Sequence, residues 1–403
     1  MNRIIVGVML VVVAVVTASF TAYLSSSKSN QSIVFSNNTM LSAIWDRYKK
    51  NYIEPNSGRT LDKQRENVTT SEGQSYSMLR SVYEDDQETF DRSWKFAQQN
   101  MQHKNDRLFS YLYGKRPDGS FGIMSEQGGN NSASDADTDI ALALILGYER
   151  WQESRYLQEA KPLINDIWEK EVVTVAGKPV MTAGDSERGA SDMVVVNPSY
   201  FAPYAYKLFA VVDQKHDWQA LSDNSYAVLN ASMSANLDKD KTVGLPPDWM
   251  LMSRKTGAIS TAAPRGLKSD YGYDAFRTPW RLAIDYKWNQ DARAKRTLER
   301  MSFLGDAWRG GNQLKAVYGH DGSVVADYEV PAMYGTALAY FTVTDEDAAK
   351  AVFAQKLESL YDPNRQSWKT ELSYYDDNWA WFGMALYLDQ LPNLADNLKK
   401  DAR

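Results

Sequence analysis

A helical spacing of apolar residues runs through this chain from residue 38 almost to its end. In one segment after another, apolar side chains fall three and four residues apart, which is the pattern of a helix with one buried face. We count roughly a dozen such segments, and the clearest cover residues 140–151, 280–288, 332–341 and 379–388. Strand signals are few and short, and the best is a hairpin over residues 172–181. The spacing therefore predicts an all-α fold.

The length of the chain limits how these helices can be arranged. No break in composition divides the sequence after residue 38, so one large domain is expected. An open solenoid would show a repeat period and polar caps, and the sequence has neither. We therefore predict helix pairs that close into a ring, with short β-hairpin insertions.

The N-terminus has the pattern of an export or anchor signal. Arg3 precedes an apolar run over residues 4–24, which is long enough for a membrane span of about 20 residues. Small residues around Ala18 would equally suit cleavage of a signal peptide. We expect a signal peptide or membrane anchor plus linker over residues 1–30 and a main domain over residues 31–403, secreted or anchored outside the cytoplasm.

Composition argues against several classes of function. The net charge of -6 leaves no basic surface for nucleic acid, so no nucleic-acid partner is expected. The three histidines are far apart in the sequence, which argues against a catalytic zinc site. No metal and no cofactor are expected.

Three acidic positions lie where helices are predicted to begin. Glu72 follows three cap-type residues, Asp135 opens the apolar run that ends at Trp151, and Asp274 lies just before the helix-starting pair at residues 278–279. A single acid at a helix start is more often a cap than a catalyst. Three of them in an aromatic-rich chain point to sugar hydrolysis by paired carboxylates, which needs no metal.

The residues around these acids resemble glycoside hydrolase family 8. The signature of the family begins Ala-Ser/Thr-Asp-Ala/Gly-Asp and ends in Trp, and residues 133–151 match it with Gly147 in place of Ala. Further similar segments are Ser71-Glu72-Gly73 with Tyr76, Asn197-Pro198-Ser199-Tyr200-Phe201, and Tyr273-Asp274-Ala275 with Arg277. The match runs in order from about residue 40 to residue 390 and covers essentially the whole main domain.

The resemblance implies an (α/α)6 barrel and hydrolysis with inversion at the anomeric carbon. Glu72 would be the general acid and Asp274 the general base, with Tyr200 helping to hold the attacking water. Asp135 would bind and distort the sugar at the cleavage point. Asp137 and Asp139 are expected to be structural.

Four side chains are expected to bind substrate: Tyr200, Arg277, Tyr273 and Trp94. Arg277 could orient Asp274 or simply pair with it. Trp94, Trp249 and Trp280 are candidates for stacking on the apolar face of a sugar ring, and a place in the core fits each of them at least as well.

The substrate expected from the resemblance is a β-linked polysaccharide or oligosaccharide. An endo-acting β-1,4-glycanase on cellulose or a related β-glucan is the first expectation. A xylanase or chitosanase of the same family is the alternative, as is a polysaccharide-binding or trimming accessory of a cell-envelope synthesis complex. A helical toroid of the lyase type would be expected to use a different acid-base set, often with His.

Overall fold

The structure is a computed structural model and describes residues 39–401, with side chains up to residue 398. The expected signal or anchor segment over residues 1–30 lies outside these residues. Within the described part of the chain, no helix combines the length and apolarity needed to cross a membrane.

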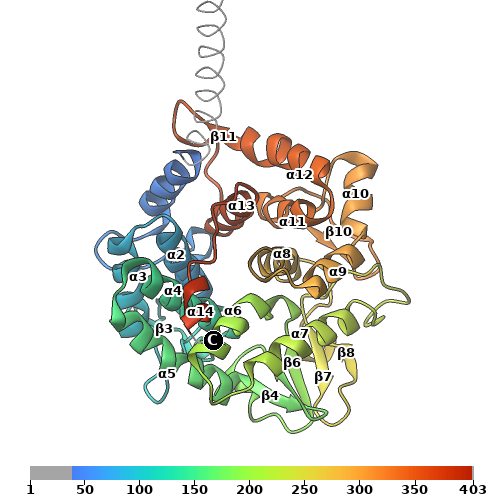
Figure 1. Cartoon of the computed structure of the whole chain (residues 1–403), viewed down its shortest axis with the longest axis horizontal. Helices are drawn as coiled ribbons and strands as arrows, with labels where there is room; N and C mark the ends of the chain where they lie inside the picture. Colours follow the sequence, from blue (N-terminus) through green and yellow to red (C-terminus); the bar gives the residue numbers. More distant parts are fainter. Residues whose placement is uncertain (1–38, 402–403) are drawn as a thin grey trace, which may run out of the picture.

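Helices make up most of the described chain, as the apolar spacing predicted (Figure 1). The first covers residues 39–52. The others of at least six residues are α2 (Ser71–Tyr83), α3 (Gln87–Asn100), α4 (Ser134–Trp151), α5 (Ser154–Glu171), α6 (Pro203–Val212), α7 (Trp218–Ser232), α8 (Thr278–Asn289), α9 (Ala292–Arg300), α10 (Phe303–Gly311), α11 (Pro331–Thr344), α12 (Glu346–Val352), α13 (Tyr374–Tyr387) and α14 (Asp396–Asp401).

Alternate helices form a closed inner ring. Helix α2 contacts α4, and the contacts continue through α6, α8, α11 and α13 back to α2. These helices are buried around much of their circumference: residues 134–147 of α4 and 332–341 of α11 are all buried. A helix that is apolar all round is stable only inside a core. Helices such as α3 and α9 bury a single face, and α3, α5, α10 and α12 lie at the rim (Figure 1).

Two close contacts hold α13 in the ring. A Cβ on Gly335 would lie 2.0 Å from the carbonyl oxygen of Trp379, and a Cβ on Gly383 would lie 2.0 Å from that of Gly335. Glycine at both positions therefore lets the backbones of α11 and α13 touch. On the other side, the buried Arg80 guanidinium of α2 donates to Asp377 of α13 at 2.9 Å.

Short strands connect the helices at their ends. The predicted hairpin is confirmed as β4 (Val172–Val175) and β5 (Lys178–Met181), joined by two residues with positive φ. Antiparallel β1 (Thr69–Thr70), β2 (Leu112–Lys115) and β3 (Phe121–Ile123) form one small sheet, and β6 (Met193–Val196), β7 (Met250–Ser253) and β8 (Ile259–Thr261) form another. The remaining pairs are β9 (Val317–Tyr318) with β10 (Val324–Ala326), and β11 (Tyr361–Asp362) with β12 (Ser367–Trp368).

The inner helices place sequence-distant residues at one end of the ring. Glu72 and Asp135 lie in the first turns of α2 and α4, and Asp274 and Arg277 directly precede α8. Arg277, just before α8, bonds to Glu72 and to Asp135, so the N-terminal ends of α2, α4 and α8 lie close together. This end of the ring therefore holds the candidate site.

Candidate active site

The buried guanidinium of Arg277 is the centre of the site. Its Nη1 donates to Glu72 at 2.6 Å and to Asp135 at 2.9 Å, and its Nη2 donates to Asp274 at 2.6 Å and to Ser199 at 3.2 Å. One fully buried cation therefore binds all three acids predicted from the sequence. The structure contains the expected pair of Arg277 and Asp274, and the same guanidinium also binds Glu72, Asp135 and Ser199.

Glu72 is placed by the cap of its helix. Thr70 accepts a hydrogen bond from the backbone N–H of Gly73, which fixes the first turn of α2. The hydroxyl of Tyr374, from the start of α13, donates to the second carboxylate oxygen of Glu72 at 3.2 Å. The Glu72 side chain keeps 22 % of its surface exposed, so it can reach a bound ligand.

The surroundings of Glu72 favour its protonated form. Burial raises the pKa of Glu72 to about 7, Arg277 opposes that rise, and the negative charges of Asp135 and Asp274 add to it. A carboxyl group with a pKa near neutrality can donate a proton at the pH where most enzymes work.

Asp274 is held at both carboxylate oxygens. Arg277 donates to Oδ1, and the indole N–H of Trp249 donates to Oδ2 at 3.1 Å. Burial raises the pKa of Asp274 above its ordinary value, and the Arg277 cation opposes this. Its side chain is 28 % exposed, so Asp274, like Glu72, is accessible from solvent.

Asp135 and Tyr200 complete the wall of the site. The Asp135 side chain is only 2 % exposed, and its Oδ1 accepts a hydrogen bond from the backbone N–H of Ala136. The ring of Tyr200 lies under the Arg277 guanidinium at 5.2 Å and meets Trp249 edge-on at 5.8 Å. Burial raises the pKa of Tyr200 far above its ordinary value, and the nearby Asp135 and Asp274 charges add to this, so the phenol keeps its proton.

The other two predicted substrate-binding residues lie in different surroundings. Tyr273 is 40 % exposed beside Asp274, and its hydroxyl is 3.3 Å from that of Tyr328. Trp94 is in α3, only 7 % exposed, and packs edge-on against Phe109 at 5.8 Å. Tyr273 is the chain neighbour of Asp274 and contacts Tyr375 and Tyr328, whereas the described ring contact of Trp94 is with Phe109.

The remaining acids of the signature, Asp137 and Asp139, are buried and bond to partners other than Arg277. Asp139 makes a two-pronged ion pair with Arg281 of α8, at 3.0 and 2.9 Å. Asp137 is fully buried and accepts from the backbone N–H of Phe109, and burial together with Glu171 raises its pKa well above the ordinary value. Both carboxylates tie α4 to its neighbours.

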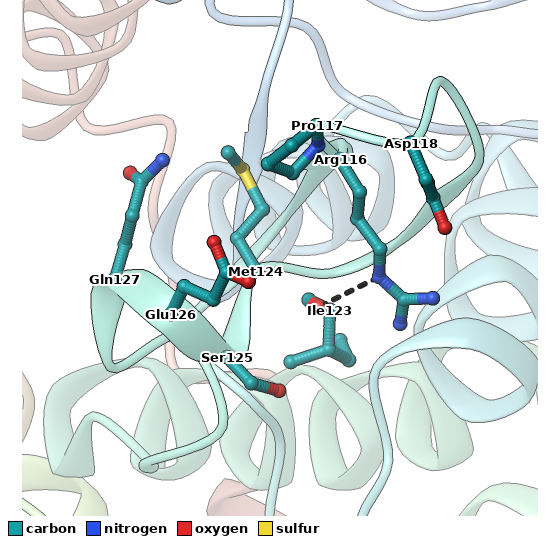
Figure 2. A pocket seen from close by; sticks show the side chains of 8 residues that line it. All are labelled: Arg116, Pro117, Asp118, Ile123, Met124, Ser125, Glu126 and Gln127. Atoms are coloured by element: carbon teal, nitrogen blue, oxygen red, sulfur yellow. Dashed lines mark hydrogen bonds between the residues drawn. The ribbon is translucent and has the colours of Figure 1, made fainter.

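A separate hollow of ≈ 310 Å³ lies on the β2–β3 hairpin (Figure 2). Arg116 lines it and donates to the carbonyl oxygen of Ile123, and none of the three acids lines it. Across the described residues 39–401, no group of three or more His, Asp or Glu side chains could hold a metal ion.

Two neighbours of the acids, Tyr374 and Asp248, were not predicted as site residues. Trp249 was predicted only as a possible sugar-stacking residue, and its bond to Asp274 was not predicted. Tyr374 carries a weak signal, because it begins an apolar helix directly after the cap-type residue Ser373. Trp249 and Asp248 lie in a loop before β7 with no local pattern to mark them.

Comparison with known proteins identifies the family of this chain. The family model for glycosyl hydrolases family 8 matches residues 11–382. Endoglucanase C of Ruminiclostridium cellulolyticum is 31 % identical over 326 residues, which cover 78 % of this chain and 65 % of that protein. The chain thus spans just under two thirds of the length of this protein and of two similar curated endoglucanases.

Solved structures share the fold. The family 8 endoglucanase Cel10 of Klebsiella pneumoniae is 25 % identical with a TM-score of 0.64, over 86 % of this chain and 99 % of that one. A β-1,3-1,4-glucanase from Paenibacillus sp. X4 is 22 % identical with a TM-score of 0.72, over 89 % of this chain and 93 % of that one. The predicted (α/α)6 barrel is confirmed. The family match over most of the chain, the closed helical ring and the three acids at one end of it together show that this protein belongs to glycosyl hydrolases family 8.

Proposed function

We propose that this chain is an exported, endo-acting β-1,4-glycanase that hydrolyses cellulose or a related β-glucan with inversion. The observation that carries the proposal is the pair formed by Glu72, whose pKa is raised to about 7, and Asp274, held beside it by the same guanidinium. The endoglucanase names of its relatives support a β-glucan substrate.

In this proposal Glu72 protonates the departing glycosidic oxygen. Its raised pKa keeps the proton available, and its partial exposure lets it reach the sugar. The Tyr374 hydroxyl and the Arg277 guanidinium orient the carboxyl group by binding one oxygen each. After the bond breaks, Arg277 stabilises the carboxylate that Glu72 becomes.

Asp274 takes the proton of the attacking water. Both of its oxygens are held, so the carboxylate presents a fixed direction to the water, and the Tyr200 phenol lies next to it. Direct attack by water on the face opposite the leaving group inverts the anomeric carbon. Asp135, bound to the same guanidinium, binds the sugar at the cleavage point.

Export is proposed from residues 4–24, which have the composition of a signal or anchor. That part of the chain lies outside the described residues, so the proposal depends on sequence alone. Cell fractionation of the full chain would test it, and a catalytic domain found in the cytoplasm would contradict it.

The function is tested by release of reducing ends from carboxymethyl cellulose, mixed-linkage β-glucan, xylan and chitosan. We expect fastest release from one of the two β-glucans, with a rapid fall in viscosity because an endo-acting enzyme cuts within the chain. Glu72→Gln and Asp274→Asn should fold normally and lose nearly all hydrolysis.

Faster release from xylan or chitosan would replace the proposed substrate while leaving the chemistry in place. Full activity in either variant would overturn the acid and base assignments. A folded wild-type protein that cleaves none of the four polymers would favour the binding or accessory role.

A further inference from the structure

The loop that carries Asp274 is fastened by a second carboxyl group, that of Asp248. Its Oδ1 accepts hydrogen bonds from the backbone N–H groups of Gly272 at 3.1 Å, Asp274 at 3.1 Å and Ala275 at 2.7 Å. The next residue in the chain, Trp249, donates to the Asp274 side chain. Two adjacent residues thus hold the backbone and the carboxylate of Asp274.

Asp248 fills the capping role that the side chain of Asp274 would otherwise fill. Asp274 is the N-cap of the short helix η6 (Ala275–Arg277), and an Asp at this position commonly caps the exposed N–H groups itself. Its side chain makes no cap bond here, and points to Arg277 and Trp249. Asp248 satisfies the N–H groups in its place.

The backbone is shaped to admit Asp248. A Cβ on Gly272 would lie 2.7 Å from Asp248 Oδ2, closer than real Cβ contacts allow. Asp248 is itself anchored, because its backbone N–H donates to the carbonyl oxygen of Asp270. The carboxyl group therefore closes on the loop from a fixed position.

We propose that Asp248 is a positioning residue for the general base: by capping η6 it leaves the Asp274 carboxylate free and aimed at the attacking water. This inference rests on the proposed role of Asp274 as the base. Asp248 acts through the backbone of residues 272–275, to which its carboxyl group is bound.

The protonation state of Asp248 suggests a matched pair of variants. Burial, with the Asp274 charge adding to it, raises the pKa of Asp248 to about 8, so the group is largely neutral at neutral pH. Asp248→Asn keeps an oxygen acceptor of the same shape and should preserve the three bonds. Asp248→Ala removes the acceptor and leaves three N–H groups without it.

The test measures kcat and KM on cellohexaose for the full chain. Asp248→Ala should lower kcat by on the order of 10²-fold with KM nearly unchanged, because small misplacements of a catalytic group cost about that much. Asp248→Asn should stay close to the wild type. Gly272→Ala, which pushes against the same carboxyl group, should lose kcat in the same way.

Azide separates a misplaced base from a damaged fold. Azide needs no deprotonation: it forms the C1–N bond while the C1–O bond breaks and Glu72 protonates the leaving oxygen. Azide should therefore restore turnover of Asp248→Ala and of Asp274→Ala, giving an α-glycosyl azide from a β-linked substrate.

The outcomes distinguish the role of Asp274 as the base from the role of Asp248 in positioning it. Full activity in Asp274→Ala would overturn the base assignment itself. If Asp274→Ala is inactive and rescued by azide, the inference about Asp248 is overturned by undiminished kcat in Asp248→Ala, by a loss that azide does not rescue, or by an equal loss in Asp248→Asn.

Discussion

Replacement of Arg277 by methionine tests the view that one cation balances three acids. The guanidinium is fully buried and bonds to Glu72, Asp135 and Asp274. Methionine fills a similar volume and carries no charge. Asp135, with a side chain 2 % exposed, would then be a buried carboxylate without its cation. Removing one partner of a buried ion pair typically costs about 3–5 kcal/mol in unfolding free energy.

The cost should depend on pH. Without Arg277, the folded protein raises the pKa values of Glu72 and Asp274 further, so it binds protons that the unfolded chain has released. The stability of Arg277→Met should therefore fall relative to the wild type as pH rises, by up to about 1.4 kcal/mol per pH unit for each proton involved.

Urea unfolding followed by tryptophan fluorescence at about pH 5 and about pH 8 measures both effects. We expect a clearly larger loss at the higher pH. Arg277→Lys retains the positive charge and should lose less unfolding free energy at both pH values. An equal loss at the two pH values, or a loss below about 1 kcal/mol, would refute the account of Arg277 as the balancing cation.

Three further predictions concern the acid, the ring and the buried carboxyls. Glu72→Gln should lose activity on polymer but keep much of it on an aryl β-glycoside whose leaving group needs no proton. Wild-type activity on polymer should decline as pH rises through about 7, because Glu72 then loses its proton. A Glu72→Gln variant equally inactive on both substrates would contradict the role of Glu72 as the acid. Gly383→Ala should destabilise the protein by about 1–3 kcal/mol, because its Cβ would meet the Gly335 oxygen, whereas Gly310→Ala, with open space around it, should not, as thermal unfolding would show. Burial raises the pKa of Glu171 to about 8, above its value in the unfolded chain, so the unfolding free energy of the wild type should fall as pH rises through about 8. The unfolding free energy of Glu171→Gln should fall less over the same pH range. An identical fall in the two proteins would exclude Glu171 as the group responsible.

The fold could be predicted from sequence because the inner helices carry their own signal. Helices such as α4 and α11 are long and carry extended apolar runs, and Pro or cap-type residues mark where several of them start. The order of contacts around the ring carried no such signal, because it depends on pairs such as Arg80 and Asp377, 297 positions apart.

The three acids of the site were predicted from the sequence, and most of the contacts that join them were not. The sequence indicated three helix starts and, through the family resemblance, a role for each acid. It did not indicate that Arg277 joins Glu72 across 205 positions, because no local spacing records such a contact. Asp248 was missed for the same reason: its partners are backbone N–H groups that any residue would supply.

Trp94 shows the limit of reading aromatic residues from a sequence. Its spacing fitted both a core position and a sugar platform, and the structure places it in the packed face of α3 against Phe109. Tyr273 has no better local signal, yet it is exposed beside Asp274. Burial of single aromatic side chains is decided by helix packing, which the spacing leaves open.

The most direct test of the account is the anomeric form of the first product. Proton NMR during hydrolysis of cellohexaose by the wild-type protein should show the α-anomer appearing first, because water held by Asp274 attacks opposite the bond that Glu72 protonates. First appearance of the β-anomer would mean retention through a covalent intermediate, and would contradict the roles assigned to Glu72 and Asp274.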